Sequence, residues 1–277
     1  ARLDEFSSIW DYRGDGRERN EAARVSFTGN DELLVDAACR ALGLDYTLEP
    51  PRVEYDHVVV LGGLSRACLA RPLAAARLIA DGRIRTGSVV ALGGFRKLGD
   101  SEEALLAELK LDGCECEFDV IDAGMRRAFS GYGAAAVQHG PRSRRSRLSG
   151  TLSGNAWRIH VYAADGRPDL RVVAAPAPSA QQRATTASTY AWLANDAGLL
   201  QRGQSVLIVT THHYRPFQLA DAICDLGLPL DLTVDAFGMS PGDYDARLAY
   251  KPRTEEYLQE VRSTIRSYRR LLAALTG

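Results

Sequence analysis

The residues best suited to chemistry follow two short apolar runs of similar form. VVVLGGLSR covers residues 58–66 and VVALGGFR covers residues 89–96, so each run ends in Leu-Gly-Gly with an arginine close behind. Glycine allows a close approach of the backbone or a positive φ, and exposed amides in such a turn can hold an anion. Arginine adds forked hydrogen bonds to a carboxylate or phosphate. The two runs therefore predict two halves of one ligand site.

Neither run matches a familiar nucleotide motif. Gly62-Gly63 is followed by Leu-Ser-Arg, which is neither GxGxxG nor the GxxxxGK[ST] loop. A tight turn alone is the plain alternative for each glycine pair. Surface placement is the alternative for Arg66 and Arg96, because lysine occurs only at positions 97, 110 and 251 and arginine carries nearly all the positive charge. The repeated offset of arginine after Gly-Gly favours the functional interpretation.

A third apolar run, VLIVTTHHYR over residues 206–215, places two histidines directly after a strand. Neutral imidazole can act as a base or a metal ligand. Adjacent residues of an extended segment point in opposite directions, so His212 and His213 are not expected to chelate one ion, and we predict no metal site. Glu103 falls in the first turn of the helix expected after the second Gly-Gly. It could act as a pocket carboxylate or only stabilise the helix dipole.

Hydroxyl groups are concentrated in QRATTAST, residues 182–189, at the start of another expected helix. Capping accounts for one of them, so a ligand role for Thr185 or Thr186 is a second hypothesis. Ligands of open α/β sheets bind beyond the carboxyl ends of the strands, which selects one set of residues. We predict acid–base roles for Glu103, His212 and His213. The predicted ligand contacts are Gly62, Gly63, Ser65, Arg66, Gly93, Gly94, Phe95, Arg96, Thr185, Thr186, Thr210, Thr211, Tyr214 and Arg215.

Alternating strands and helices must position these residues. Continuous apolar runs predict parallel strands buried on both faces, and amphipathic stretches between them predict crossover helices. The expected strands are 58–61, 88–92, 117–121, 157–163, 170–174, 205–210 and 230–236, and Asp165-Gly166 is typical of a hairpin turn. The expected helices are 30–43, 69–81, with Pro72 in the first turn, 101–111, 185–197, 214–226 and 254–275. The fold class is therefore α/β, a three-layer αβα Rossmann-like domain with a mostly parallel sheet.

Three regions interrupt or flank this pattern. Residues 1–50 are expected to form a helical N-terminal extension, and residues 51–277 the αβα domain, with 124–165 as an insertion that contains a hairpin or lid. The tract PRSRRSR, residues 141–147, could contact nucleic acid. No aromatic residues interleave with Arg142–Arg147 and the chain has a net charge of −1, which favours a solvated loop.

The order of these motifs resembles that of the SanA/YdcF/ElyC-like proteins, a Rossmann-like family of unknown function. The likeness covers residues 55–122 and 183–237. Gly62-Gly63 and Gly93-Gly94 align with the family's two glycine pairs, Glu103-Ala104 with its Glu-Ala, and Thr186 with a threonine near its Glu-Asn. Residues 209–211 align with its Val-Thr-Ser. This chain has Ser188 and Thr189 in place of Glu-Asn, and His-His-Tyr-Arg-Pro where the family has Tyr-His and Pro-Arg. The resemblance implies a nucleotide-like ligand, with S-adenosylmethionine as one candidate.

Composition limits the remaining function classes. The chain has 277 residues, 45% hydrophobic and 25% charged, as in soluble globular proteins, and no apolar run is long enough to cross a membrane. Five cysteines match no disulfide scaffold and predict free thiols in a cytoplasmic protein. We therefore expect a protein that binds a small anionic or nucleotide-like molecule and acts as a transferase or hydrolase. The alternative is a non-catalytic ligand sensor or a partner-binding protein; neither membrane nor nucleic-acid partners are expected.

Overall fold

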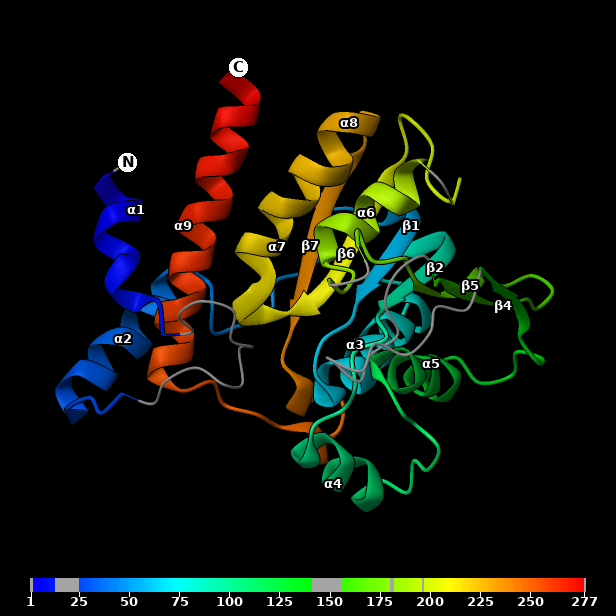
Figure 1. Ribbon diagram of the computed structural model, residues 1–277, viewed down its shortest axis with the longest axis horizontal. Helices are drawn as coiled ribbons and strands as arrows, with labels where there is room; N and C mark the ends of the chain where they lie inside the picture. The colour runs from blue at the N-terminus through cyan, green and yellow to red at the C-terminus, as the bar shows by residue number, and fades with distance from the viewer. Residues whose placement is uncertain (1, 13–24, 141–155, 180–181, 196, 277) are drawn as a thin grey trace.

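A sheet of seven strands lies between two layers of helices (Figure 1). The computed structural model describes residues 2–12, 25–140, 156–179, 182–195 and 197–276. The strand order is β3-β4-β5-β2-β1-β6-β7. The strands β5, β2, β1, β6 and β7 form the parallel core of the sheet, and β3 and β4 add an antiparallel edge next to β5. The three-layer Rossmann-like class predicted from sequence is confirmed.

The strands are short and apolar, as parallel strands covered on both faces must be. They are β1 (Glu54–Leu61), β2 (Arg85–Gly93), β3 (Ala136–His139), β4 (Arg158–Tyr162), β5 (Asp169–Ala174), β6 (Ser205–Thr211) and β7 (Thr233–Met239). Alternate residues of β1 point to opposite faces, so Val58 and Val60 belong to one core cluster and Val59 and Leu61 to another.

The helices cover both faces of the sheet. They are α1 (Arg2–Phe6), α2 (Gly29–Ala41), α3 (Ser65–Ala80), α4 (Asp100–Glu108), α5 (Glu117–Ala128), α6 (Thr186–Asn195), α7 (Arg215–Ala222), α8 (Leu228–Leu230) and α9 (Thr254–Thr276). Short 3-10 turns are η1 (Ser7–Trp10), η3 (His212–Tyr214), η5 (Pro241–Asp243) and η6 (Ala246–Leu248), and η4 (Ile223–Gly227) is a π-helical turn. Residues of α3 and α5 share the core cluster of Val58, whereas residues of α6 and α7 share that of Val59.

One expected strand is a helix. Residues 117–121 open α5, and the third strand of the parallel sheet is β5. The Asp119 carboxylate accepts the Cys116 N–H at 3.1 Å, which caps the first turn. Phe118, Ile121 and Met125 then recur at helical spacing and are fully buried. The short apolar run alone did not distinguish a strand from a buried helix.

Helix α3 begins at Ser65, four residues before the expected start, so Pro72 lies inside it rather than in its first turn. Pro72 has no N–H to donate to the carbonyl oxygen of Cys68. Gly124 of α5 faces that oxygen so closely that a Cβ at position 124 would overlap it and lie 3.3 Å from the Leu69 Cα. The two helices therefore pack with their backbones in close approach.

The two flanking regions are built differently from one another. In the N-terminal region α2 is capped by Thr28, and its Cys39 packs with Leu44 against Tyr257 of α9. In the expected insertion 124–165, the described residues finish α5 and form β3 and β4, which extend the sheet. Arg142–Arg147 lies outside the described residues.

Among the helices of the described residues, none combines the length and the apolar character that crossing a membrane requires.

Candidate functional site

The two glycine turns meet at the carboxyl ends of β1 and β2, where Leu61 is in register with Leu92. A Cβ at Gly62 would overlap both the Leu92 carbonyl oxygen and Oε1 of Glu117. A Cβ at Gly93 would lie 3.0 Å from the Phe118 Cα. Glycine is therefore required because the first turn of α5 packs directly against both strand ends.

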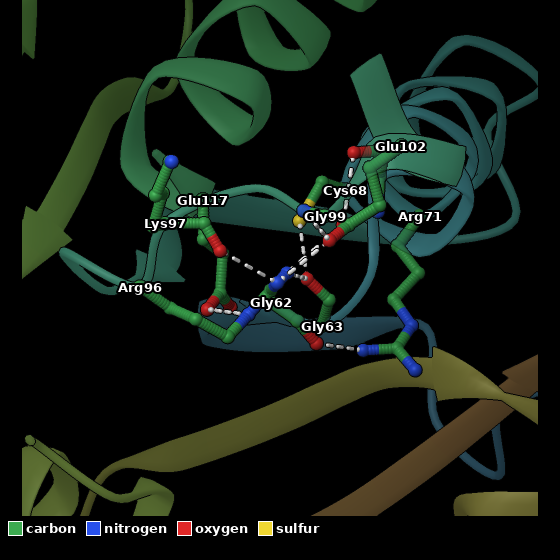
Figure 2. Close-up of polar contacts among 10 residues, drawn as sticks. Gly62, Gly63, Cys68, Arg71, Arg96, Lys97, Gly99, Glu102 and Glu117 are labelled. Atoms are coloured by element: carbon green, nitrogen blue, oxygen red, sulfur yellow. Dashed lines mark hydrogen bonds and ion pairs between the residues drawn. The ribbon is translucent and has the colours of Figure 1, made fainter. Parts of the chain in front are cut away.

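Glu117, the first residue of α5, places its carboxylate between the two turns (Figure 2). It accepts a backbone hydrogen bond from Gly63, and Oε2 lies 3.5 Å from Nε of Arg96. The side chain is only 16% exposed. Burial raises the pKa of Glu117, and this effect outweighs the opposing influence of Arg96. A buried carboxyl group with a raised pKa at a strand end can hold, donate or accept a proton.

Arg96 is bound by a second carboxylate. Its Nη1 lies 2.7 Å from Oε2 of Glu102, and its Nη2 donates to Oε1 at 3.0 Å and to the Gly63 carbonyl oxygen at 3.0 Å (Figure 2). Ser65 donates to Oε1 of Glu102 from both its N–H, at 2.8 Å, and its hydroxyl, at 3.0 Å. Arg96 and Ser65, predicted as ligand contacts, thus hold the two turns together.

Glu102 is buried, whereas the predicted Glu103 is exposed on the next position of α4. Burial would raise the pKa of Glu102, but hydrogen bonds and charge from Arg96 outweigh it and lower that pKa. The Gly99 N–H also donates to Glu102, at 3.1 Å, which makes Gly99 and Glu102 a capping pair. Because glycine stands at the cap position where serine or threonine is usual, this arrangement has no clear signature in the sequence.

The two predicted arginines contact different parts of the chain. Arg66 donates to the Arg247 carbonyl oxygen at 2.8 Å and so links α3 to the segment before α9. Phe95 is half-buried, with its ring 6.2 Å from that of Phe118 and the Arg158 guanidinium 5.5 Å from it. Gly94 lies near Glu117, because a Cβ there would be 3.6 Å from Oε2.

Strands β1 and β6 are adjacent and parallel, and their following helices α3 and α7 cover opposite faces. This is the topological switch point, where α/β folds commonly bind nucleotides. Arg71 of α3 fills it with a side chain that is almost fully buried. Its Nη1 donates to the carbonyl oxygens of Leu61, at 2.9 Å, and Gly62, and its Nη2 to Oγ1 of Thr211 at 3.0 Å. Thr211, which was predicted to contact a ligand, therefore accepts hydrogen bonds from Arg71.

The other predicted residues at the end of β6 and just beyond it also contact protein groups. The Thr210 hydroxyl donates to Gln218, and Nε of Arg215 donates to the Ala236 carbonyl oxygen at 2.8 Å. Nδ1 of His212 lies 3.2 Å from the Met239 carbonyl oxygen, and burial lowers the pKa of this imidazole.

His213 packs its ring 3.9 Å from that of Tyr214 and 6.1 Å from that of Tyr257 on α9. Together with the His212 contact to β7, this places both imidazoles toward β7 and α9, and β7 lies two strands from β1. Of the three residues predicted for acid–base chemistry, none is in direct contact with the glycine turns in the contacts described, and Glu117 takes that position.

The residues just before α6 lie near Glu117, because the charge of Arg183 acts on the Glu117 carboxyl group. Thr185 caps this helix: its hydroxyl accepts the Ser188 N–H at 3.2 Å. Thr185 and Thr186 are both exposed, so the two predicted threonines remain accessible. Sequence reasoning missed Arg183, which the arginine-rich background concealed. In the described part of the chain, no group of three or more acidic, histidine or cysteine side chains is arranged to hold a metal ion.

Comparison with known proteins extends the similarity over nearly the whole chain. A family model described as the Rv3785 N-terminal domain matches residues 1–43. Two uncharacterised proteins, Rv3785 of Mycobacterium tuberculosis (strain ATCC 25618 / H37Rv) and Mb3814 of Mycobacterium bovis (strain ATCC BAA-935 / AF2122/97), are each 30% identical over 298 aligned positions. Each alignment covers 98% of this chain and 80% of the relative. No solved structure matches the chain.

Proposed function

The chain belongs to the family of the uncharacterised mycobacterial protein Rv3785, and we propose that it binds a small polar molecule at the carboxyl ends of β1 and β2. The observation that carries this proposal is the buried Glu117 carboxyl group, which lies between the two glycine turns with a raised pKa. Placing a carboxyl group there opposes folding in its ionised form, so a role in ligand chemistry gives a reason for it.

The proposed ligand has a group that exchanges hydrogen bonds with Glu117, such as a hydroxyl or an amine. When protonated, Glu117 donates a hydrogen bond; when ionised, it accepts one and can remove a proton. An anionic part of the ligand would face Arg183 and the exposed Thr185 and Thr186 at the start of α6. Arg96 is already bound by Glu102 and Glu117, and Arg66 by a backbone carbonyl oxygen, so neither is assigned to the ligand.

Ligand screening and a matched pair of variants test this proposal. Nucleotides, sugar phosphates and S-adenosylmethionine form the first panel, since the sequence motifs resemble a nucleotide-binding family. We expect one class to raise the thermal unfolding midpoint of the wild type. Glu117→Gln should weaken that ligand by on the order of tenfold, because a hydrogen bond to a charged group contributes about 1.5–3 kcal/mol. The exposed Glu103→Gln is the control. Equal affinity in wild type and Glu117→Gln would refute the assignment.

A non-catalytic ligand sensor is the second candidate function. It is favoured by the positions of His212 and His213, which contact β7 and α9 rather than the glycine turns. Glu117 is then the acid–base group described at the carboxyl ends of β1 and β2. Mass spectrometry of the ligand after prolonged incubation separates the candidates. A ligand recovered unchanged, with Glu117→Gln altering only its affinity, supports the sensor; a product that disappears in Glu117→Gln supports the enzyme.

We also propose a cytoplasmic location. It is supported by the cysteines, all five of which are free thiols, and burial raises the pKa of the thiols, as at Cys39, where the pKa reaches about 12. Protonated, buried thiols of this kind suit a reducing compartment. Fractionation of cells that express the tagged chain measures the location directly.

A further inference from the structure

Large apolar side chains are exposed where α1 lies beside α9 (Figure 1). Each of them has between 47% and 68% of its surface exposed. We call this set the α1–α9 face; its members are Leu3 and Phe6 of α1 and Tyr268, Leu272 and Leu275 of α9. The face is separate from the glycine turns, since none of its members contacts them in the interactions described.

The N-terminal segment and α9 run in opposite directions. Asp4 forms an ion pair with Arg269, near the end of α9. Asp11 lies further along the N-terminal segment, and its Oδ2 is 3.2 Å from Nη2 of Arg262, almost two turns earlier on α9. Residue numbers therefore rise along one element as they fall along the other, which makes α1 and α9 an antiparallel pair.

This antiparallel arrangement brings the exposed residues together on one side. In an antiparallel helix pair, the residues that directly precede two facing residues lie on the same side of the contact. Leu3 precedes Asp4 and Tyr268 precedes Arg269, so Leu3 and Tyr268 share that side. The other three members of the face are three, four or seven residues further along their own helices and continue the same two rows. The exposed side chains thus form one continuous surface.

The row on α9 has the spacing of a helix-packing seam. Intervals of three and four residues alternate along it, through Leu258, Val261, Ile265, Tyr268, Leu272 and Leu275. This spacing is the one that packs against a second helix in a coiled coil. Val261, early in the row, packs with Cys39 of α2, whereas the last three residues of the row are exposed. Among the described residues, the later half of the seam lacks the covering helix that α2 gives to the earlier half.

We propose that a second copy of this chain covers the α1–α9 face in a two-fold symmetric dimer. A large side chain buries about 150–250 Å², so five residues exposed to this extent offer on the order of 600 Å² per copy and about 1,200 Å² for two copies. A specific interface needs about 1,000 Å² in total, and apolar patches on monomers rarely exceed about 600 Å². The area therefore suits a dimer.

The chemistry of the face also suits a second copy. A two-fold interface brings the same surface of both copies together, so each copy supplies the other with a helix of matching seam spacing. Arg2 and Glu5, both exposed on α1, carry opposite charges and can pair across the symmetry axis. Residues 13–24, which follow in the sequence, contain no apolar side chain larger than alanine and offer little to an apolar surface.

Sedimentation equilibrium of the full chain tests this proposal. We expect a reversible monomer–dimer equilibrium that persists in high salt, because salt screens charges and leaves apolar contacts intact. Leu272→Glu should raise the dimer Kd about a hundredfold, since it removes a buried leucine from both halves of the interface. Val137→Glu is the matched control, an exposed apolar position on the edge strand β3, and should leave the Kd unchanged.

Phe6→Ser extends the test to α1 and should also raise the dimer Kd. Because both positions are largely exposed, the variants should keep the wild-type circular dichroism spectrum, which shows that each has folded. A chain that stays monomeric at high micromolar concentration would overturn the proposal and leave the face to a different partner. A dimer that dissociates in high salt, or whose Kd is the same in wild type, Leu272→Glu and Phe6→Ser, would place the interface elsewhere.

Discussion

Arg96 and Glu102 form a two-pronged ion pair, with Nη1 2.7 Å from Oε2 and Nη2 3.0 Å from Oε1. Only 16% of the arginine side chain and 7% of the glutamate side chain are exposed. Glu102 also accepts two hydrogen bonds from Ser65, and Arg96 donates one to the Gly63 carbonyl oxygen. A single buried ion pair thus connects the turns after β1 and β2 with the start of α4.

Removing one partner of this ion pair should lower the free energy of unfolding more than replacing both partners does. Arg96→Met leaves Glu102 charged and buried, and we expect it to lower the free energy of unfolding by about 3–5 kcal/mol. The double variant Arg96→Met/Glu102→Met removes both charges and should recover part of that loss. Urea denaturation measures both values. A single variant within about 1 kcal/mol of wild type, the usual range of an exposed pair, would contradict the structural role.

Gly62→Ala should destabilise the protein by about 1–3 kcal/mol or more, because the added Cβ overlaps a backbone oxygen that cannot move aside easily. Gly87→Ala on β2 is the matched control: its Cβ would lie 3.6 Å from the Asp56 carbonyl oxygen, an ordinary contact. We expect the control to be neutral or slightly stabilising in the same urea titration. If both variants unfold at the wild-type midpoint, the Leu92 carbonyl oxygen does not approach Gly62 as described.

Glu117 should make stability fall as pH rises. Its pKa is raised by burial, so between the ordinary glutamate pKa and this raised value the folded state binds more protons than the unfolded state. Stability decreases with rising pH across that window and is constant above it. Glu117→Gln should remove this decrease, so its stability relative to wild type should grow with pH and then level off.

Unfolding free energies measured in urea at several pH values check this sign. The exposed Glu103→Gln is the control and should follow the wild-type profile. Glu102 acts in the opposite direction: its lowered pKa adds stability above the ordinary glutamate value, and this is lost as pH falls through the folded pKa. The Glu117 effect is therefore taken as the difference between variant and wild type. A difference that does not change with pH would show that the Glu117 pKa is not raised.

Arg71→Met should lower the free energy of unfolding by about 3 kcal/mol or more, because the Leu61 and Gly62 carbonyl oxygens and the Thr211 hydroxyl lose their shared donor. Each buried polar group left without a partner costs about 1–3 kcal/mol. Arg77→Met, an exposed position two turns later on α3, should cost less than about 1 kcal/mol. Guanidinium-induced unfolding compares the two. A similar small effect at both positions would mean that Arg71 does not secure the switch point.

Most of the fold could be predicted from the sequence because the apolar runs and helical periodicities are strong. The runs ending at Leu61, Leu92 and Thr211 are all strands, and α9 matches its expected bounds within a residue or two. Among the described residues, the one element of wrong type is 117–121. This run is short, and its order Glu-Phe-Asp-Val-Ile begins with alternating charged and apolar residues, so its pattern fits a strand as well as a helix.

The site was predicted less completely. The position of Gly62-Gly63 beside Gly93-Gly94 follows from the pairing of adjacent parallel strands, and the sequence indicates it. Which charged residues meet there depends on the crossover helix, and α5 brings Glu117 rather than Glu103 to the turns. Arg71 is seven residues into α3, and only the packing of that helix shows that it reaches β6. Pairings of this kind arise from tertiary contacts that sequence spacing does not encode.

Pro72 and Gly124 also limit how this sequence can diverge. The proline leaves the Cys68 carbonyl oxygen without its helical donor, and the glycine brings α5 against that oxygen. Any side chain at position 124 must first drive α3 and α5 apart, and this would shift Glu117 at the other end of α5 relative to the glycine turns. The contact between α3 and α5 at Gly124 thus determines how closely the Glu117 carboxyl group approaches the glycine turns.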